Sequence, residues 1–363
     1  MLQAALKIPG YWLFRQIGWP RWSAMNLTLS VSFNCNSRCR TCNVYTRKAQ
    51  ELSLEEWTRI FQSLKQTPFW VTISGGEPFL NKDIEQLAGS LYDVCRPSII
   101  NIPTNGLLQE RIPTIVEQIA RHCIESQIVI NLSIDEIEER HDAIRGVPGN
   151  YSKALKTYAA LKAIHAPNLT VGIHTVISSF NVRRVPQIYE HLRALDPDSY
   201  VTEIAEERVE LNTIGAEITP ESSAYASAVD SLMERVREDG FSRIGRIARA
   251  FRLEYYELVK KILTEKRQVI PCYAGIASAQ IAPNGDVWMC CTKAESIGNL
   301  KGTNYDFTKV WTSKKARELR QRIKKKECYC PLANAAYTNM LFNFRTLLQA
   351  GGNLMRNSKK RSL

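Results

Sequence analysis

Short apolar runs rich in β-branched residues alternate with helix-length amphipathic stretches over residues 26–205. The apolar runs lie at Leu27–Phe33, Phe69–Ser74, Ile99–Ile102, Ile128–Ile134, Leu169–Ile177 and Tyr200–Ile204. The stretches with helical periodicity lie between them, at Leu54–Lys65, Asp83–Val94, Pro113–His122, Ser152–His165 and Val185–Leu195. This alternation predicts βαβ units and a parallel sheet. Six strands are too few to close an eight-stranded barrel, so we expect an α/β fold with a partial barrel and ligands at the carboxyl ends of its strands.

The remainder of the chain predicts a different organisation. Helical periodicity through Ser222–Glu238 and Ile244–Thr264 indicates a helical connector. An Asn284-Gly285 pair between apolar alternations predicts a hairpin over Ile281–Trp288, and a helix is expected at Trp311–Lys326. The expected organisation is an N-terminal basic and aromatic segment at 1–25, a core at 26–205, the connector at 206–270, a small hairpin-plus-helix module at 271–331, and an amphipathic, basic tail at 332–363.

Composition excludes several classes of protein. Of the 363 residues, 44% are hydrophobic and 23% are charged, which is typical of a globular chain and not of a disordered or fibrous one. No run approaches the roughly 18 apolar residues of a membrane-spanning helix, and the first residues do not resemble a secretory signal. We therefore expect a cytoplasmic protein.

The net charge of +12 is concentrated at the two ends of the chain. Residues 1–50 carry seven basic side chains and no acidic one, and residues 331–363 carry five basic side chains and no acidic one. Aromatic and apolar residues accompany these charges, which favours contact with an anionic surface such as the inner face of a membrane. Packing of both ends against the barrel is the alternative. No nucleic-acid-binding module is recognisable, so nucleic acid is not an expected partner.

Ten cysteines dominate the functional argument. Cys35, Cys39 and Cys42 follow the first predicted strand in a C-x3-C-x2-C arrangement. Clustered thiols in a chain without a secretory signal indicate metal ligands. Three thiolates on a four-iron cluster leave one iron open to an outside ligand, which is typical of a reactive site rather than a structural one. The isolated Cys95 and Cys123 are expected to be buried within helices.

Polar and glycine-rich turns follow the next three predicted strands: Gly75-Gly76-Glu77, then Thr104-Asn105, then Ser133 and Asp135. Two glycines let a backbone approach a ligand closely, and a carboxylate can accept hydrogen bonds from an ammonium group or a ribose hydroxyl. For Thr104-Asn105 an ordinary loop is the alternative. Nearby, Arg145 can pair with a cofactor carboxylate or form a structural ion pair with Asp142 or Glu138.

In these motifs the chain resembles the radical S-adenosylmethionine (radical SAM) superfamily. The resemblance implies a [4Fe–4S] cluster held by the three-cysteine loop after the first strand of a partial (β/α)6 barrel. It implies that the Gly-Gly-Glu segment holds the amino group of bound S-adenosylmethionine. It also implies the reaction, in which an electron from the cluster splits S-adenosylmethionine and a 5′-deoxyadenosyl radical takes a hydrogen atom from an unactivated carbon. A reductase such as flavodoxin or ferredoxin would supply the electron.

A second set of cysteines lies near the carboxyl end: Cys272, Cys290 or its neighbour Cys291, Cys328 and Cys330. This segment is similar to the SPASM and twitch modules that hold auxiliary iron–sulfur clusters, which implies one further cluster. Zinc is the alternative, because four thiolates also suit zinc. Adjacent residues of a strand point to opposite faces, so only one of the neighbouring pair can reach the cluster, and we expect Cys290.

The substrate is not readable from these motifs. The amphipathic, basic ends favour a small molecule, and among small molecules a lipid or lipid-linked one. A peptide- or sugar-modifying radical SAM enzyme is one alternative. A non-catalytic metal-binding module that contacts nucleic acid or an acidic partner is the other. The acidic run at Glu203, Glu206, Glu207 and Glu210 follows the sixth predicted strand, where a substrate could bind with Arg208 and Asn212 nearby. A solvated connector is the favoured alternative.

Overall fold

The structure, a computed structural model, describes residues 2–238 and 243–359. Its centre is one sheet in the order β6-β5-β4-β3-β2-β1-β7-β8-β9. Six strands of this sheet run parallel to one another: β1 Asn26–Ser32, β2 Trp70–Gly75, β3 Ile99–Thr104, β4 Gln127–Ser133, β5 Leu169–Ile177 and β6 Ser199–Ile204. All six predicted strands are therefore confirmed, as is the α/β class with a partial barrel.

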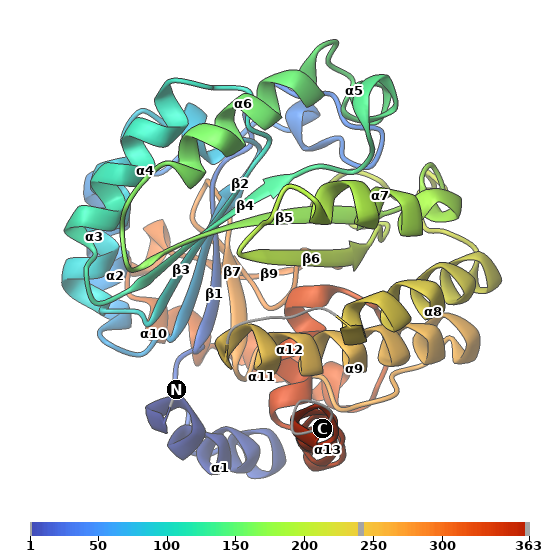
Figure 1. Ribbon diagram of the computed structural model, residues 1–363. Helices are drawn as coiled ribbons and strands as arrows, with labels where there is room; N and C mark the ends of the chain where they lie inside the picture. Colours follow the sequence, from blue (N-terminus) through green and yellow to red (C-terminus); the bar gives the residue numbers. More distant parts are fainter. Residues whose placement is uncertain (1, 239–242, 360–363) are drawn as a thin grey trace.

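Helices cover the outer face of this parallel sheet, as Figure 1 shows. They are α2 Leu54–Leu64, α3 Ile84–Cys95, α4 Arg111–His122, α5 Glu138–Arg145, α6 Asn150–Lys162 and α7 Val185–Arg193. Five of them were predicted, and α5 was not, because its eight residues carry too few apolar positions to show a helical period. Cys95 and Cys123 are buried in this outer layer, as expected.

The alternation of side chains along each strand separates two environments. On β4, the apolar Ile128, Ile130 and Leu132 are fully buried, whereas the intervening Asn131 and Ser133 are only partly buried. Successive residues of a strand point to opposite faces. The apolar set packs with the helices in the main hydrophobic core, and the polar set faces the interior of the barrel. The interior is therefore polar and is suited to binding rather than to packing.

The carboxyl-terminal segment extends the same sheet. Strand β7 Ser278–Ile281 pairs in parallel with β1, and β8 Asp286–Trp288 and β9 Ser296–Asn299 follow as antiparallel strands. The predicted hairpin is confirmed, and Gly285 supplies the positive φ of 88° that its turn requires. Because β7 continues the sheet from β1, the segment 271–331 is joined to the core by main-chain hydrogen bonds. The expected domain boundaries stay predictions.

Further helices surround the lower part of the molecule in Figure 1. They are α1 Leu2–Ile17, α8 Ser222–Glu238, α9 Arg243–Glu265, α10 Phe307–Trp311, α11 Lys314–Lys324, α12 Ala333–Leu341 and α13 Phe344–Lys359. Short 3-10 helices are at Val44–Thr46, Pro78–Leu80, Val182–Arg184 and Lys301–Thr303. Helices α8 and α9 confirm the predicted connector. The predicted helix at Trp311–Lys326 is instead interrupted, because the Ser313 side chain caps a new helix by accepting from Ala316 N.

The last four residues of the expected basic tail, 360–363, lie outside the described residues. Among the helices that the structure describes, none has the length and apolar character needed to cross a bilayer.

Candidate functional site

The first three cysteines lie together in the loop that follows β1. Cys35, Cys39 and Cys42 are partly buried, and the Cys35 sulfur accepts a hydrogen bond from Ser37 N at 3.4 Å. Burial raises the pKa of Cys35 to about 11 and that of Cys42 to about 12, and the neighbouring cysteine charges add to the effect. The free Cys35 and Cys42 thiols are therefore protonated at neutral pH, and a metal that binds them must displace protons.

Gly75 and Gly76 lie directly against the cysteine loop. A Cβ atom at Gly75 would stand 2.2 Å from the Ser32 carbonyl oxygen, and one at Gly76 would stand 2.1 Å from that of Asn34. Gly76 N donates to Ser32 O at 2.8 Å, and the next amide, of Glu77, donates to Asn34 O at 2.9 Å. The glycines are needed because two backbones touch here. The sequence argument anticipated close approach to a ligand, and in the structure the closest neighbour is the cysteine loop itself.

The Glu77 carboxylate links the ends of β2 and β3. Its Oε1 accepts from Thr104 Oγ1 at 2.8 Å and from Phe79 N at 3.2 Å, and its Oε2 accepts from Asn105 N at 2.8 Å. Burial raises the pKa of Glu77 to about 7, although these hydrogen bonds oppose the shift. The carboxylate is thus occupied by internal donors, and Thr104 contributes to the same link.

Asn105 connects this link to the cysteine loop. Its Nδ2 donates to Asn36 Oδ1 at 2.7 Å and to Ser37 Oγ at 3.1 Å, and it lies 4.0 Å from the Cys35 sulfur. Since Asn105 is buried, these contacts hold the loop in one conformation. Thr104 and Asn105 are buried and bonded within the protein, so cofactor binding by these two residues stays a prediction, and an ordinary structural loop stays the alternative.

Arg145 braces the other side of the loop. Its Nε lies 2.9 Å from Asp135 Oδ2, and its Nη1 donates to the Cys39 sulfur at 3.7 Å. Burial alone would lower the pKa of Arg145. The charges of Asp135 and Cys39 together have the larger effect and keep the pKa of Arg145 above its usual value. The expected structural ion pair therefore exists, but with Asp135 and not with Asp142 or Glu138.

The residues around Arg145 have structural roles as well. Asp142 accepts from Gly149 N at 2.6 Å and from Tyr151 N at 2.7 Å, which caps the start of α6. His141 Nδ1 accepts from Asp135 N at 3.1 Å, and its Nε2 lies 2.9 Å from Asn150 Oδ1. Burial, with the nearby Arg145 charge, lowers the pKa of His141 to about 4, so the imidazole is neutral at pH 7.

Polar side chains line the barrel interior beside the cysteine loop. Ser133 is partly buried and stands opposite His174 in the β4–β5 register. His174 Nε2 lies 3.5 Å from Glu203 Oε1, and Asn131 Nδ2 donates to Asn101 Oδ1 at 2.8 Å. Hydrogen-bond donors, acceptors and the His174–Glu203 pair thus lie on the interior side of the parallel strands. This arrangement can orient a polar substrate.

The segment after β6 crosses this interior, which sequence reasoning missed. Its amides pair with the chain beyond β8: Val209 N donates to Thr292 O at 3.1 Å and Glu210 N to Cys291 O at 3.4 Å. Glu206 and Glu210 are consequently buried, and the expectation of a solvated connector is wrong. Glu210 also accepts from Gln280, a β7 side chain that in turn donates to Ser30 Oγ of β1 at 2.8 Å.

Arg208 stands at the centre of this segment. Its Nη1 donates to the Cys291 sulfur at 3.8 Å, and its charge also acts on Cys42 of the first loop. Burial opposes the charge, but Cys291 and the carboxylates of the acidic run raise the pKa of Arg208. Its Nε is buried without a hydrogen-bond partner among the described residues, as is Glu206 Oε2. These atoms form a polar group between the two sets of cysteines.

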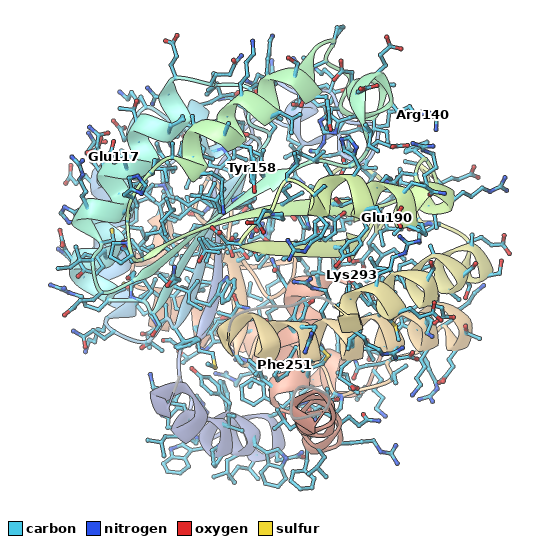
Figure 2. The ribbon with its side chains drawn as sticks, viewed as in Figure 1. Glu117, Arg140, Tyr158, Glu190, Phe251 and Lys293 are labelled. Atoms are coloured by element: carbon cyan, nitrogen blue, oxygen red, sulfur yellow. The ribbon has the colours of Figure 1, made fainter. Side chains whose placement is uncertain are left out.

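The second set of cysteines gathers around the end of β8. Burial raises the pKa of Cys290 to about 12, and the charges of Cys272 and Cys328 add to this effect. Burial also raises the pKa of Cys330, and the charges of Cys272 and Cys290 add to this effect. Cys290 and Cys328 also line a cavity of about 160 Å³, whose wall includes Lys293. In the view of Figure 2, Lys293 is labelled between the barrel strands and α9.

Cys291 turns the other way, toward Arg208 and the apolar Leu332 and Ala335. The strand alternation that favoured Cys290 does not apply, because β8 ends at Trp288 and both cysteines lie in the turn that follows. The assignment of Cys290 stays a prediction. Among the described residues, no three His, Cys, Asp or Glu side chains lie close enough to hold a single metal ion. A cluster of several irons separates its ligands more widely than one ion does.

The two sets lie at opposite ends of the sheet. Cys35 follows the carboxyl end of β1, whereas Cys272 precedes β7, which is parallel to β1. Cys290 follows β8, which runs in the opposite direction, so it too lies at the amino ends of β1 and β7. The first set therefore lies at the carboxyl ends of the strands, where ligands were expected, whereas the second set lies at the other end because the hairpin reverses the chain.

Comparison with known families identifies both regions. Residues 29–192 match the radical SAM superfamily, and residues 272–331 match the iron–sulfur cluster-binding domain called SPASM. Fe-coproporphyrin III synthase of Methanosarcina barkeri is 28% identical over 45% of this chain and 39% of its own length. PqqA peptide cyclase of Granulibacter bethesdensis is 28% identical over 47% of this chain and 44% of its own length. The chain thus spans less than half the length of these relatives.

Solved structures share the fold over most of the chain. "Native anSMEcpe with bound AdoMet and Cp18Cys peptide" superimposes with a TM-score of 0.60 and 16% identity, covering 93% of this chain and 98% of that one. Streptococcus suis SuiB bound to precursor peptide SuiA gives a TM-score of 0.63 and 17% identity, covering 88% and 71%. At these identities the likeness concerns the fold alone.

Proposed function

Because the chain belongs to the radical SAM superfamily and carries a SPASM domain, we propose that it is a radical SAM enzyme with one auxiliary cluster. A radical SAM domain binds a [4Fe–4S] cluster and S-adenosylmethionine, and a SPASM domain binds auxiliary iron–sulfur clusters. When bound, the first cluster and S-adenosylmethionine supply a 5′-deoxyadenosyl radical that takes a hydrogen atom from a substrate carbon. The residues of this chain hold and orient those groups.

The observation that carries the proposal is the braced loop with three thiols. Cys35, Cys39 and Cys42 would hold the cluster. The contacts that keep their loop in place add no fourth cysteine as a ligand. The donor set fits an iron–sulfur group, because thiolates are the ligands that such clusters take from proteins. Three ligands leave one iron available to S-adenosylmethionine.

Two kinds of role follow for the predicted cofactor-binding residues. Gly75, Gly76 and Ser133 stay proposed contacts of S-adenosylmethionine, since they lie beside the loop or face the interior. Glu77, Thr104, Asn105, Asp135 and Arg145 are already bonded to one another or to the loop, and we assign them to positioning it. For the auxiliary cluster we propose Cys272, Cys290, Cys328 and Cys330.

The substrate class has two candidates. The names of PqqA peptide cyclase and of SuiB with its precursor peptide favour a peptide. The polar interior with His174, Glu203 and Arg208 suits the hydrogen-bonding groups of a peptide. A lipid or lipid-linked substrate was expected from the apolar, basic ends, but these ends lie away from the cysteine loop and give that expectation no support. A flavodoxin or ferredoxin as electron donor and a cytoplasmic location stay proposals.

The test is reductive cleavage of S-adenosylmethionine by anaerobically reconstituted protein. With dithionite, the wild-type chain should form 5′-deoxyadenosine, and the Cys35→Ala/Cys39→Ala/Cys42→Ala variant should form none. The matched control is Cys95→Ala/Cys123→Ala, which removes two buried thiols from the helix layer and should keep the activity if the variant folds. Cleavage that survived the triple substitution would contradict the assignment, and so would a wild-type chain that binds only zinc.

A further inference from the structure

Large apolar side chains are exposed on the helices at the two ends of the chain. Exposed fractions reach 73% for Leu6 and 68% for Ile17 on α1, 67% for Trp19 just after it, and 74% for Phe344 on α13. Trp12 and Leu348 are also exposed. We call these six residues the α1–α13 face. Large apolar side chains that are exposed as a group mark an interaction site, whereas single ones are ordinary surface.

The α1–α13 face is not the packing side of α1. Tyr11 and Phe14 of that helix are buried, and the Tyr11 hydroxyl donates to Ser23 O at 2.6 Å. Arg15 Nε donates to Cys272 O at 3.1 Å and so ties the helix to the second cysteine segment. Helix α1 is therefore anchored by one side and leaves a second apolar side uncovered. The alternative that this end packs against the barrel is thus confirmed for Tyr11 and Phe14, whereas Leu6, Trp12 and Ile17 stay exposed.

The fold brings the two ends of the chain together. The rings of Tyr11 and Phe342 are 5.7 Å apart, and Phe342 lies immediately before α13. Figure 1 shows α1 and α13 on the same side of the molecule. In Figure 2, ring-bearing side chains project outward from α1 on the side away from the barrel. Two segments that are more than three hundred residues apart in sequence thus meet at Tyr11 and Phe342, and the helices that carry the exposed apolar side chains lie on the same side of the molecule.

Positive charge surrounds this surface. Neither residues 1–50 nor residues 331–363 contain an acidic side chain. Helix α11 adds further basic residues beside α1, where Lys324 Nζ donates to Gln16 O at 2.9 Å. Arg21 and Arg345 are both exposed next to the apolar residues. Tryptophan and aliphatic side chains ringed by arginine and lysine match the interface of a bilayer with anionic headgroups.

The face lies at the end of the barrel opposite the first cysteine loop. Helix α1 leads into the amino end of β1, and Cys35 follows the carboxyl end of the same strand. A surface that held α1 and α13 would leave the Cys35 loop directed toward water. The α1–α13 face and the loop proposed to carry the reaction therefore lie at opposite ends of the barrel.

We propose that the α1–α13 face attaches this protein to an anionic lipid bilayer, with the Cys35 loop turned to the aqueous side. Charge complementarity favours this occupant over a second copy of the chain, because two copies would bring two basic surfaces together. The inference goes beyond the proposed reaction and does not depend on it. Binding to vesicles needs neither S-adenosylmethionine nor a reduced cluster.

The experiment is co-sedimentation of the full-length, cluster-loaded protein with vesicles. Wild type should bind vesicles of phosphatidylglycerol and phosphatidylcholine and should bind pure phosphatidylcholine weakly. Ile17→Asp and Phe344→Asp should each lower the affinity for the anionic vesicles by about tenfold, since each removes one buried apolar contact. Arg21→Glu/Arg345→Glu should do the same and should reduce the dependence on salt.

The matched control is Ile214→Asp, which changes an equally exposed isoleucine, 66% accessible, in the loop region beyond β6. It should bind like wild type. Hydrogen exchange should slow at residues 6–22 and 342–348 on binding but not at residues 35–42. No binding to anionic vesicles, equal loss in the control, or protection of residues 35–42 would each overturn the proposal. So would sedimentation equilibrium showing a dimer that dissociates in Ile17→Asp.

Discussion

Asp135 and Arg145 are a buried ion pair, and their energetics differ from those of the surface pairs. Removing one partner of such a pair leaves an uncompensated charge in a medium that solvates it poorly. Arg145→Met should therefore lower the free energy of unfolding by about 3–5 kcal/mol. Asp135→Asn should act in the same direction. Urea unfolding under anaerobic conditions measures both changes.

The control for this pair is Arg140→Met, on the same helix. Arg140 is largely exposed and lies 4.0 Å from Glu136, so its loss should change the free energy of unfolding by about 0.5 kcal/mol or less. If Arg145→Met unfolded like wild type and only bound S-adenosylmethionine less tightly, Arg145 would serve the cofactor and not the loop.

His141 makes stability depend on pH. Its pKa is about 4 in the folded chain and about 6.5 when unfolded, so the unfolded chain binds a proton first as the pH falls. The stability that neutral His141 provides is complete above pH 6.5 and is lost as the pH falls toward 4. The free energy of unfolding should decrease by about 2 kcal/mol more between pH 7 and pH 5 in wild type than in His141→Asn.

An identical pH dependence in wild type and His141→Asn would show that the imidazole is charged or solvated in the folded state, against the geometry described above.

At the residue scale, the sequence predicts which side chains matter better than what they do. The three cysteines and the Gly-Gly-Glu segment are local in sequence, so their spacing is readable. The partner of Arg145 could not be read from the sequence. Asp135 is farther from Arg145 along the chain than Asp142 and Glu138, which were the expected partners. The burial of Arg208 and Glu206 was not predicted, because it depends on main-chain pairing between residues 209–210 and 291–292. A charged run carries no signal of such a distant contact.

At the scale of elements, the turn after β2 controls the cysteine loop. Gly75 has a φ of 135°, which side chains rarely allow, and its Cβ would clash with Ser32 O. Gly75→Ala should displace the loop and lower the bound iron by about half, because one of two clusters is lost. Iron and protein analysis after anaerobic reconstitution measures this, and Gly302→Ala, where a Cβ meets open space, is the control.

A Gly75→Ala protein with full iron content would show that the loop tolerates a shift of the neighbouring turn. The bracing role that we assign to the ends of β2 and β3 would then be wrong.

The end of β8 offers a second test between neighbouring residues. Cys290→Ala should remove the auxiliary iron, because Cys290 lies with Cys272 and Cys328. Cys291→Ala should retain that iron, because Cys291 contacts Arg208 instead. The same iron analysis distinguishes them, and the reverse result would exchange the two assignments. A protein that bound one zinc per chain at this set would favour the zinc alternative.

Elements were predictable where burial follows a regular period. The six parallel strands and the helices between them have one apolar face each, and their residues were identified from that pattern. Helix α5 was not predicted because it is short and mostly charged, and α10 was not predicted either. Helix α11 begins later than expected because the Ser313 cap is a local hydrogen bond within a basic run. The direction of the auxiliary segment required the pairing of β7 with β1, which no local pattern encodes.

At the scale of the whole molecule, the barrel holds the two sets of cysteines and the α1–α13 face in different places. The carboxyl ends of the strands hold the first cysteine loop, the amino ends hold the second set of cysteines, and the α1–α13 face lies beside the second set. The polar segment around Arg208 lies between the two sets of cysteines. This layout lets a substrate approach from the aqueous side while the opposite end is engaged elsewhere.

The most direct test of the central claim is electron paramagnetic resonance of the reduced, anaerobically reconstituted Cys272→Ala/Cys290→Ala/Cys328→Ala/Cys330→Ala protein, recorded before and after addition of S-adenosylmethionine. That variant should retain only the cluster of the Cys35, Cys39 and Cys42 loop, whose open iron can accept an outside ligand. The account predicts a [4Fe–4S] signal that changes when S-adenosylmethionine is added. A signal that does not change, or the absence of any cluster in a folded protein, would contradict it.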